Sequence, residues 1–271
     1  MNFKIGFIGA GHMAKALIFG LVGSGAYDKR DMLIYDTDAA KLENYRQAGF
    51  KVASSELEVV TNSTFVFLAV RPADLVSVLK KIAPVTTVGN VLISVAAGVS
   101  ISFIKKFTRH ECKVVRIMPN TASQLCLGAT ALSYDMPVTY SELTAVREML
   151  ENIGVVEILP EDRMNEVISL NSSSPVYVYM LARAMMDGAK NQGIDEDTAR
   201  RLAVQTILGA AHMLDSSNED ISKMISDVCT PNGTTIKAVD YLEKRGFEQA
   251  LADAMLTCTK RANMIEKEIE G

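Results

Sequence analysis

Apolar residues in the first half of the chain form short runs that alternate with amphipathic segments. The runs at 3–9, 31–36, 51–54, 64–70, 90–98 and 113–120 are typical of buried strands. Apolar residues in the segments between them recur at three- and four-residue intervals, which predicts helices over 12–25, 38–49, 55–63, from Asp74 onward and over 101–107. Strands that alternate with helices indicate an α/β fold with a doubly wound, mostly parallel sheet.

The pattern changes after about residue 160. Helical spacing with almost no strand signal predicts helices over 176–190, 197–215, 219–228 and 236–270. We therefore expect two domains, residues 1–160 with the α/β pattern and residues 161–271 as an all-α domain. The apolar stripes of the second domain offer more faces than one small bundle covers, so we favour a homodimer that shares these helices over a packed monomeric bundle.

Composition narrows the class of protein. The 271 residues carry a net charge of −4, which excludes a basic field for nucleic acid or an anionic membrane. No apolar stretch is long enough to cross a bilayer, and we find no secretory signal. The four cysteines form no C-x-x-C pair, and the histidines (His12, His110 and His212) are scattered, so we expect no metal site and a cytoplasmic protein with reduced thiols.

The pattern G-x-G-x-x-A occupies residues 9–14, where the first strand turns into the first helix. Gly9 permits the tight turn, Gly11 lets the backbone approach a pyrophosphate, and Ala14 keeps helix and strand close. The pattern follows a strand, opens a helix and is met by an acid at the end of the second strand. In that context it predicts a dinucleotide site of the Rossmann-like type.

The first helical turn and the end of the second strand bear on the cofactor. His12 and Met13 open a helix whose free N–H groups face the phosphates. Asp36 can accept from the ribose 2′-hydroxyl of NADH and repels the 2′-phosphate of NADPH. In the competing interpretation, room and charge for that phosphate come from Thr37, Lys41 and Arg46. NADH and NADPH both stay open, with a slight preference for NADH.

Small or rigid residues follow three further strands at the same edge, at 69–72, 96–98 and 118–121. Ligands of doubly wound sheets lie across the carboxyl ends of the strands, and residues without bulk leave room for a flat nicotinamide. We expect Asn120 to pair with its carboxamide. The remaining cofactor contacts predicted at this edge are Ala69, Val70, Arg71, Pro72 and Ala97.

With these segments in place, the chain resembles the pyrroline-5-carboxylate reductase family over about residues 3–266. The matching stretches are IGFIGAGHMAKAL, FLAVRP, ISVAAGV, VVRIMPNTAS, SSPVYVYM, AVQTILGAAHML and VCTPNGTTIKAVDYLEKRGFEQAL. The resemblance implies reduction of the cyclic imine 1-pyrroline-5-carboxylate to L-proline with NADPH or NADH, the last step of proline biosynthesis. It also implies a dimer interlocked through the helical domains, which assembles into larger rings in some members.

The connection CTPNGTTIKA, residues 229–238, carries more hydroxyls than a helix–helix turn needs. The substrate is a small anion, and its carboxylate can be held without a cation by Thr230 and the amides of Gly233 and Thr234, before a helix expected from near Ile236. A threonine-capped helix start is the alternative. By resemblance, Thr235 is the catalytic hydroxyl donor at the imine nitrogen, and the substrate pocket includes Ser173 and Pro175.

Four positions depart from the family pattern: Arg71 replaces Lys, Ser172 replaces Gly, Val176 replaces Ala and Asn232 replaces Gly. Asn tolerates positive φ, so we expect a left-handed residue at Asn232. Ser172 bears on substrate affinity or choice more than on the fold.

Three alternative functions stay open. An imine reductase for another ring size would differ in pocket volume, and Ser172 with Val176 suggests a cofactor-binding protein with impaired turnover. A β-hydroxyacid dehydrogenase would need a catalytic Lys one turn before an Asn, and this region offers only Lys190-Asn191 at the wrong helix end.

Overall fold

The computed structural model describes residues 3–108 and 112–270, so His110 lies outside the described residues. The chain forms two compact units: unit 1 comprises Met1–Ser173 and Thr257–Gly271, and unit 2 comprises Ser174–Leu256. This division by contacts differs from the expected boundary at residue 160. The end of the last helix belongs to unit 1. Helical periodicity in the sequence does not show that the chain comes back to the first unit.

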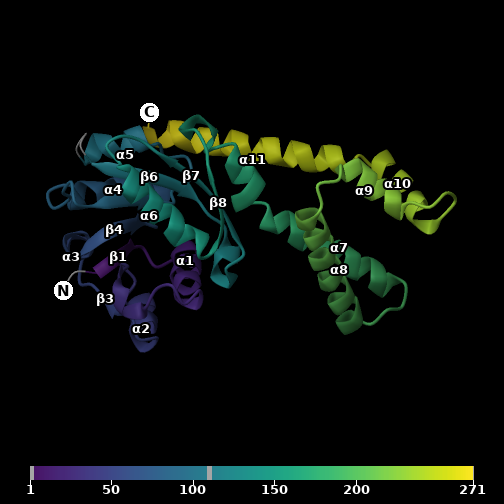
Figure 1. Ribbon diagram of the computed structural model, residues 1–271, viewed down its shortest axis with the longest axis horizontal. Helices are drawn as coiled ribbons and strands as arrows, with labels where there is room; N and C mark the ends of the chain where they lie inside the picture. Colours follow the sequence, from purple (N-terminus) through teal and green to yellow (C-terminus); the bar gives the residue numbers. More distant parts are fainter. Residues whose placement is uncertain (1–2, 109–111, 271) are drawn as a thin grey trace. The chain divides into compact units, whose positions relative to one another are not determined.

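Within the described residues, one sheet holds eight strands in the order β3-β2-β1-β4-β5-β6-β7-β8 (Figure 1). All neighbouring strands are parallel except β6 and β7, so the mostly parallel sheet is confirmed. The sequence analysis did not predict β7 and β8, which follow the last predicted strand. The strands are β1 Phe3–Ile8, β2 Met32–Tyr35, β3 Lys51–Val52, β4 Ser63–Leu68, β5 Val91–Ser94, β6 Lys113–Met118, β7 Gly128–Tyr134 and β8 Gly154–Ile158.

Helices cover both faces of this sheet. One face packs against α1 (His12–Gly23), α2 (Ala39–Gln47) and α6 (Tyr140–Glu151). The other face packs against α3 (Glu56–Asn62), α4 (Pro72–Ile82) and α5 (Ile101–Phe107). Because both faces are buried, the strands are apolar along their length, and Phe7 stacks on its cross-strand neighbour Phe67 with ring centroids 4.6 Å apart.

Local capping sets where the helices of unit 1 begin. Ser55 precedes α3 and accepts from the Glu58 backbone N–H at 3.2 Å, as expected of an N-cap. Helix α4 begins at Pro72 rather than at Asp74, because proline is favoured in the first turn, where its missing N–H costs no hydrogen bond.

A buried polar network joins the sheet of unit 1 to the last turns of α11 (Phe247–Glu270). Arg116 on β6 is buried and donates to the Asn165 side chain at 2.7 Å. Asn165 in turn donates to Glu266 of α11 at 2.7 Å. A side chain at Gly98 would lie 2.9 Å from the Ala262 carbonyl oxygen, so glycine there permits the close approach of α11.

Unit 2 is helical, as predicted. Its helices are α7 Pro175–Asn191, α8 Glu196–Ser216, α9 Ile221–Val228, α10 Thr234–Lys244 and the first part of α11. The prediction of a single helix over 236–270 is wrong. The chain breaks it at Gly246, whose φ of +67° ends α10, and α10 begins two residues earlier than expected.

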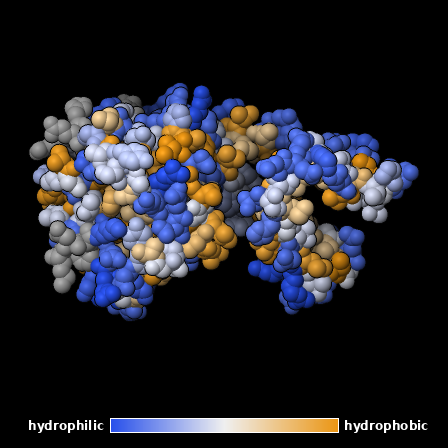
Figure 2. Space-filling model, viewed as in Figure 1, coloured by the Kyte–Doolittle hydropathy of each residue, from blue (hydrophilic) through white to orange (hydrophobic). Residues whose placement is uncertain are grey.

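Unit 2 buries almost none of its apolar surface. Among its described residues, only Ala199 and Ala203 of α8 are buried hydrophobics. Leu202 and Met213 on the same helix are 60% and 61% exposed, although the sequence places Leu202 on an apolar stripe with the two alanines. Apolar side chains accordingly reach the surface of these helices (Figure 2). In the described parts of the chain, no helix has the length and apolarity needed to cross a membrane.

Candidate functional site

The glycine-rich loop follows β1 in the geometry that the sequence predicts. Gly9 has φ +98°, and an added Cβ would lie 2.5 Å from the Ala69 carbonyl oxygen at the end of β4. Only glycine fits between these two strand ends. A Cβ on Gly11, the N-cap of α1, would meet nothing within 4 Å. The open space at Gly11 suits the close approach of a pyrophosphate to the N-terminus of α1.

Asp36, at the end of β2, connects the two neighbouring loops. Its Oδ2 accepts from the Ala10 backbone N–H at 2.7 Å, and its Oδ1 accepts from the Asp38 backbone N–H at 2.9 Å. Lys41 Nζ lies 3.4 Å from Oδ2, and 11% of the Asp36 side chain is exposed. Each carboxylate oxygen has a second lone pair, so Asp36 braces the loop and can still accept from a ribose hydroxyl.

A cavity of about 470 Å³ lies beside this loop, entirely within unit 1. The predicted residues that line it are Gly9, Gly11, Asp36, Ala69, Val70 and Arg71. Thr37 and Lys41 line it too, whereas Arg46 pairs with Glu43 on the exposed face of α2. These residues come from the ends of three parallel strands, so the cavity lies where a doubly wound sheet holds its ligand.

The sequence analysis missed Glu56 and Lys81, which also line this cavity. Glu56 begins α3 and is buried, and its Oε1 lies 2.8 Å from Lys81 Nζ near the end of α4. The hydrogen bond to Glu56 raises the pKa of Lys81. Arg71 pairs in the same way with Asp74, with 2.7 Å between Nε and Oδ2. The acidic and basic residues are visible in the sequence, but their spacing does not show which of them form ion pairs in the fold.

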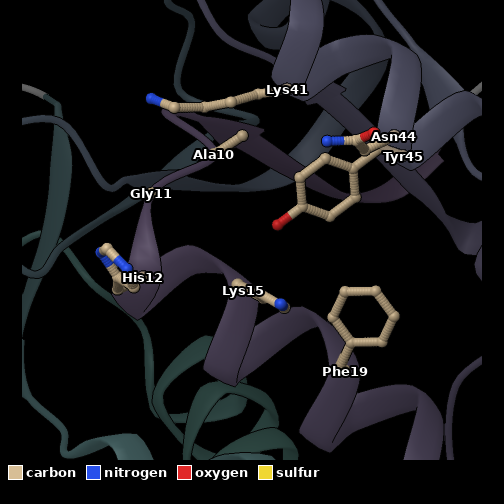
Figure 3. Close-up of a pocket in the computed structure, with 8 residues that line it drawn as sticks. All are labelled: Ala10, Gly11, His12, Lys15, Phe19, Lys41, Asn44 and Tyr45. Atoms are coloured by element: carbon tan, nitrogen blue, oxygen red, sulfur yellow. The ribbon is translucent and has the colours of Figure 1, made fainter.

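A second cavity of about 460 Å³ opens between α1 and α2 (Figure 3). His12, which we expected on the phosphate side, is exposed and lines it with Lys15. The Tyr45 ring is buried, and Figure 3 shows its hydroxyl pointing toward the space between the helices. Burial, then the charge of Asp36, raises the pKa of Tyr45 to about 12, so this hydroxyl stays protonated at neutral pH.

Two further residues expected at the cofactor pack into the fold instead of lining either cavity. Met13 packs against the core below α1, and Ala97 packs against the cluster around Met118. Both are partly buried.

Asn120 has a structural role that the sequence did not suggest. Its Nδ2 donates to the Asn171 carbonyl at 3.1 Å, and its Oδ1 accepts from the Ala122 N–H at 3.1 Å. The side chain is buried. One of its two N–H donors and its oxygen are therefore used within the protein, so these contacts fix the loop after β6, and the pairing with a carboxamide stays a prediction.

The segment around Ser172 is tied to the loop after β6. Asn171 Nδ2 donates to the Met118 carbonyl at 2.6 Å, and Ser172 Oγ donates to the Pro119 carbonyl at 3.0 Å. The Ser172 hydroxyl is thus paired with the backbone of this loop. Ser173 Oγ lies 3.4 Å from Cys258 Sγ. Pro175 is the first residue of α7.

The threonine-rich connection forms a tight turn before α10. Asn232 has φ +60°, which confirms the expected left-handed residue. Gly233 N–H donates to the Thr230 carbonyl at 2.9 Å, so this amide serves the turn rather than a ligand. A Cβ on Gly233 would lie 2.4 Å from Thr230 Oγ1. Since α10 begins at Thr234, the amides of Thr234 and Thr235 lie in its first turn, where helix geometry provides no partner.

The predicted site residues therefore fall into two groups. Those that surround the glycine-rich loop come together in unit 1, and Pro175 with the residues of the threonine-rich turn belongs to unit 2.

Comparisons with known proteins identify relatives of both units. A family model described as pyrroline-5-carboxylate reductase dimerisation matches residues 161–265. A model described as NADP oxidoreductase, coenzyme F420-dependent, matches residues 4–98. The chain is 37% identical to pyrroline-5-carboxylate reductase 3 of Danio rerio, covering 96% of this chain and 91% of that protein. It is 32% identical to pyrroline-5-carboxylate reductase of Escherichia coli K12, covering 98% and 100%.

Solved structures share the fold of this chain. Pyrroline carboxylate reductase of Plasmodium falciparum with NADP bound has a TM-score of 0.90 at 23% identity, covering 98% of both chains. The pyrroline-5-carboxylate reductase of Coxiella burnetii has a TM-score of 0.87 at 28% identity, covering 98% of this chain and 99% of that one.

Proposed function

Because the chain belongs to the pyrroline-5-carboxylate reductase family, we propose that it reduces 1-pyrroline-5-carboxylate to L-proline with NADH or NADPH. The full-length match to reductases of this name carries the proposal, and the cavity beside the glycine-rich loop supports it. A reduced dinucleotide bound along this edge of the sheet would supply a hydride from its nicotinamide to the imine carbon. The departures from the family pattern do not argue against turnover, since Ser172 is hydrogen-bonded and Asn232 keeps the left-handed turn.

The residues of the glycine-rich loop hold the cofactor. The open face of Gly11 and the N-terminus of α1 receive the pyrophosphate. Asp36, already braced by the Ala10 N–H, orients the adenosine ribose through its remaining lone pairs. Ala69 and Val70 line the cavity without bulk.

The turn before α10 holds the substrate. The amides of Thr234 and Thr235 in the first helical turn, with the Thr230 hydroxyl, bind the carboxylate of the pyrroline ring. The Thr235 hydroxyl donates a hydrogen bond to the ring nitrogen. A proton must reach that nitrogen as the carbon accepts the hydride, so a donor placed there stabilises the charge that develops in the transition state.

A homodimer completes unit 2. Its helices leave large apolar side chains exposed, and the family model that covers them describes dimerisation. A second copy that contributes the same helices buries these faces symmetrically. We extend the proposal to rings assembled from such dimers. All four cysteines are free, which suits the reducing cytoplasm.

The dehydrogenase alternative finds no support in the contacts of its candidate lysine. Lys190, near the end of α7, pairs with Glu196 at 2.9 Å on the surface. A β-hydroxyacid dehydrogenase needs this charge at the reacting group, not on an exposed glutamate.

One assay separates the remaining functions. Oxidation of NADH and NADPH is followed by absorbance with pyrroline-5-carboxylate, with pyrroline-2-carboxylate and with a 3-hydroxy acid semialdehyde. We expect cofactor oxidation with the first substrate alone. Cofactor binding without oxidation would indicate a protein that has lost turnover, and oxidation with either of the other compounds would indicate a related reductase.

A further inference from the structure

We propose that the cavity beside the glycine-rich loop, which would hold the adenosine ribose of the cofactor, selects NADH over NADPH, and that Glu56 is the residue that sets this preference. The inference rests on the proposed function, because it concerns the cofactor of the same reaction. The preference that we propose depends on Glu56, a buried carboxylate at the start of α3, in addition to Asp36 at the end of β2.

The charged side chains that line this cavity neutralise one another. Three cations and three carboxylates are present within the described lining: Lys41, Arg71 and Lys81 with Asp36, Glu56 and Asp74. Lys41 Nζ lies 3.4 Å from the Asp36 carboxylate, and Arg71 Nε lies 2.7 Å from that of Asp74. Lys81 Nζ lies 2.8 Å from the Glu56 carboxylate. Every lining cation thus already has a carboxylate partner.

Glu56 and Asp36 are the least exposed carboxylates among the three. The Glu56 side chain is 6% exposed and that of Asp36 is 11% exposed, whereas Asp74 is 47% exposed and its pairing with Arg71 is open to solvent. Charges that are screened from water interact more strongly than exposed ones. Glu56 therefore places a fixed negative charge in the wall of the cavity, and the hydrogen bond that it accepts keeps Lys81 engaged.

A 2′-phosphate fits this wall poorly. A phosphate monoester carries about −1.5 to −2 charges at neutral pH and needs cationic donors to replace its water. Each available cation already has a carboxylate partner, whose negative charge offsets what the cation can offer a phosphate, and the buried Glu56 carboxylate adds repulsion from the cavity wall. The ribose diol of NADH brings no charge, and its hydroxyls can donate to the free lone pairs of Asp36. The same wall thus accepts NADH and repels NADPH.

Equilibrium binding tests the inference without turnover. Dissociation constants for NADH and NADPH are measured by fluorescence titration of the purified protein. We expect the wild type to bind NADH at least about tenfold more tightly than NADPH, as electrostatic discrimination of this kind provides. Glu56→Gln keeps the shape, frees Lys81 and should tighten NADPH roughly tenfold, with NADH changed by less than about threefold.

Matched variants keep the test decisive. Glu58→Gln removes the same charge from the same helix but lies outside the cavity lining, so it should leave the ratio of the two constants unchanged. Asp74→Asn frees the exposed Arg71 and should improve NADPH by a smaller factor, which serves if Glu56→Gln does not fold. Tighter binding of NADPH by the wild type, or an unchanged ratio in Glu56→Gln and Asp74→Asn, would overturn the inference. Failure to oxidise either bound cofactor with pyrroline-5-carboxylate would count against the proposed function alone.

Discussion

The two units of this chain differ in how completely each one folds on itself. Unit 1 buries apolar clusters on both faces of its sheet. Its glycine-rich loop is held by hydrogen bonds such as the one from the Ala10 N–H to Asp36. Unit 2 has helices of similar apolar content, yet Ala199 and Ala203 are its only buried hydrophobics among the described residues. Unit 1 thus presents a candidate site lined by its own residues, whereas unit 2 presents exposed apolar surfaces.

Apolar stripes on the helices therefore have different roles in the two units. An apolar stripe on α1 or α4 faces the sheet and stabilises the monomer, since each buried side chain contributes roughly 1.5–3 kcal/mol. The stripe on α8 that includes Leu202 contributes only when a partner covers it. Oligomer formation should therefore be part of the stability of unit 2, and the threonine-rich turn before α10, which we propose holds the substrate, belongs to that same unit.

The largest expected effect concerns the chemistry assigned to unit 2. Thr235→Val removes the hydroxyl proposed at the ring nitrogen and should lower kcat by about 100-fold or more, as loss of a positioned acid usually does. The dissociation constant for the cofactor, set in unit 1, should not change. Steady-state rates and fluorescence titration measure the two quantities.

Neighbouring substitutions provide the controls for Thr235→Val. Thr234→Val makes the same change one residue earlier and keeps the backbone amide, so we expect kcat within about threefold of the wild type, because the amide rather than the hydroxyl binds there. Thr235→Ser restores a hydroxyl and should recover most of the rate. Full activity in Thr235→Val removes this residue from the mechanism.

The next effect concerns the loop of unit 1. Gly9→Ala forces a Cβ to within 2.5 Å of the Ala69 oxygen at a φ of +98°. We expect the free energy of unfolding to fall by about 2–4 kcal/mol, from strain and overpacking together. Gly23→Ala near the end of α1 meets nothing within 4 Å and should be neutral or slightly stabilising. Urea unfolding followed by circular dichroism compares them, and equal midpoints would contradict the proposed contact.

A smaller effect tests whether unit 2 needs a partner. Leu202→Glu places a charge on the exposed stripe of α8 and should raise the dimer dissociation constant about tenfold or more, because a charge at an apolar interface must lose its water. Val88→Glu makes the same change at a residue of unit 1 that is 62% exposed, and we expect no effect on assembly. Sedimentation velocity over a concentration series measures both. A monomeric wild type, or identical behaviour of the two variants, would argue against the dimer.

The smallest effect concerns one ion pair of unit 1. The hydrogen bond from Lys105 lowers the pKa of Asp135 from its ordinary value of 3.8. A lowered folded-state pKa gives stability that is present above the unfolded value and is lost as pH falls through the folded value. Asp135→Asn should therefore cost less than about 1 kcal/mol at pH 7, because the pair is partly exposed. The difference from wild type should shrink as pH falls below the ordinary value of 3.8 and through the lower folded-state pKa, as followed by urea titrations; a constant difference would contradict this role.

The sequence predicted the first part of the fold well because each strand there is a continuous apolar run followed by a turn residue. It missed β7, α6 and β8, and it merged α10 with α11 because the helical spacing continues across Gly246. The return of α11 to unit 1 depends on Arg116, Asn165 and Glu266, which are far apart in the sequence.

The candidate site shows a similar division. Residues with a fixed position in a motif, such as Gly9, Gly11 and Asp36, lie where the motif predicts. The sequence did not indicate that Asn120 donates to the Asn171 carbonyl or that Glu56 pairs with Lys81, because neither contact follows from local spacing. Motifs thus locate the glycine-rich loop, whereas the charges that line the neighbouring cavity depend on tertiary pairing.

The central claim is that the threonine-rich turn before α10 holds the substrate through its backbone amides and the Thr235 hydroxyl. A crystal structure of the protein with NADH and L-proline tests it most directly. The account predicts proline with its carboxylate on the amides of Thr234 and Thr235 and its nitrogen at the Thr235 hydroxyl. Proline bound away from residues 230–235 would contradict the account.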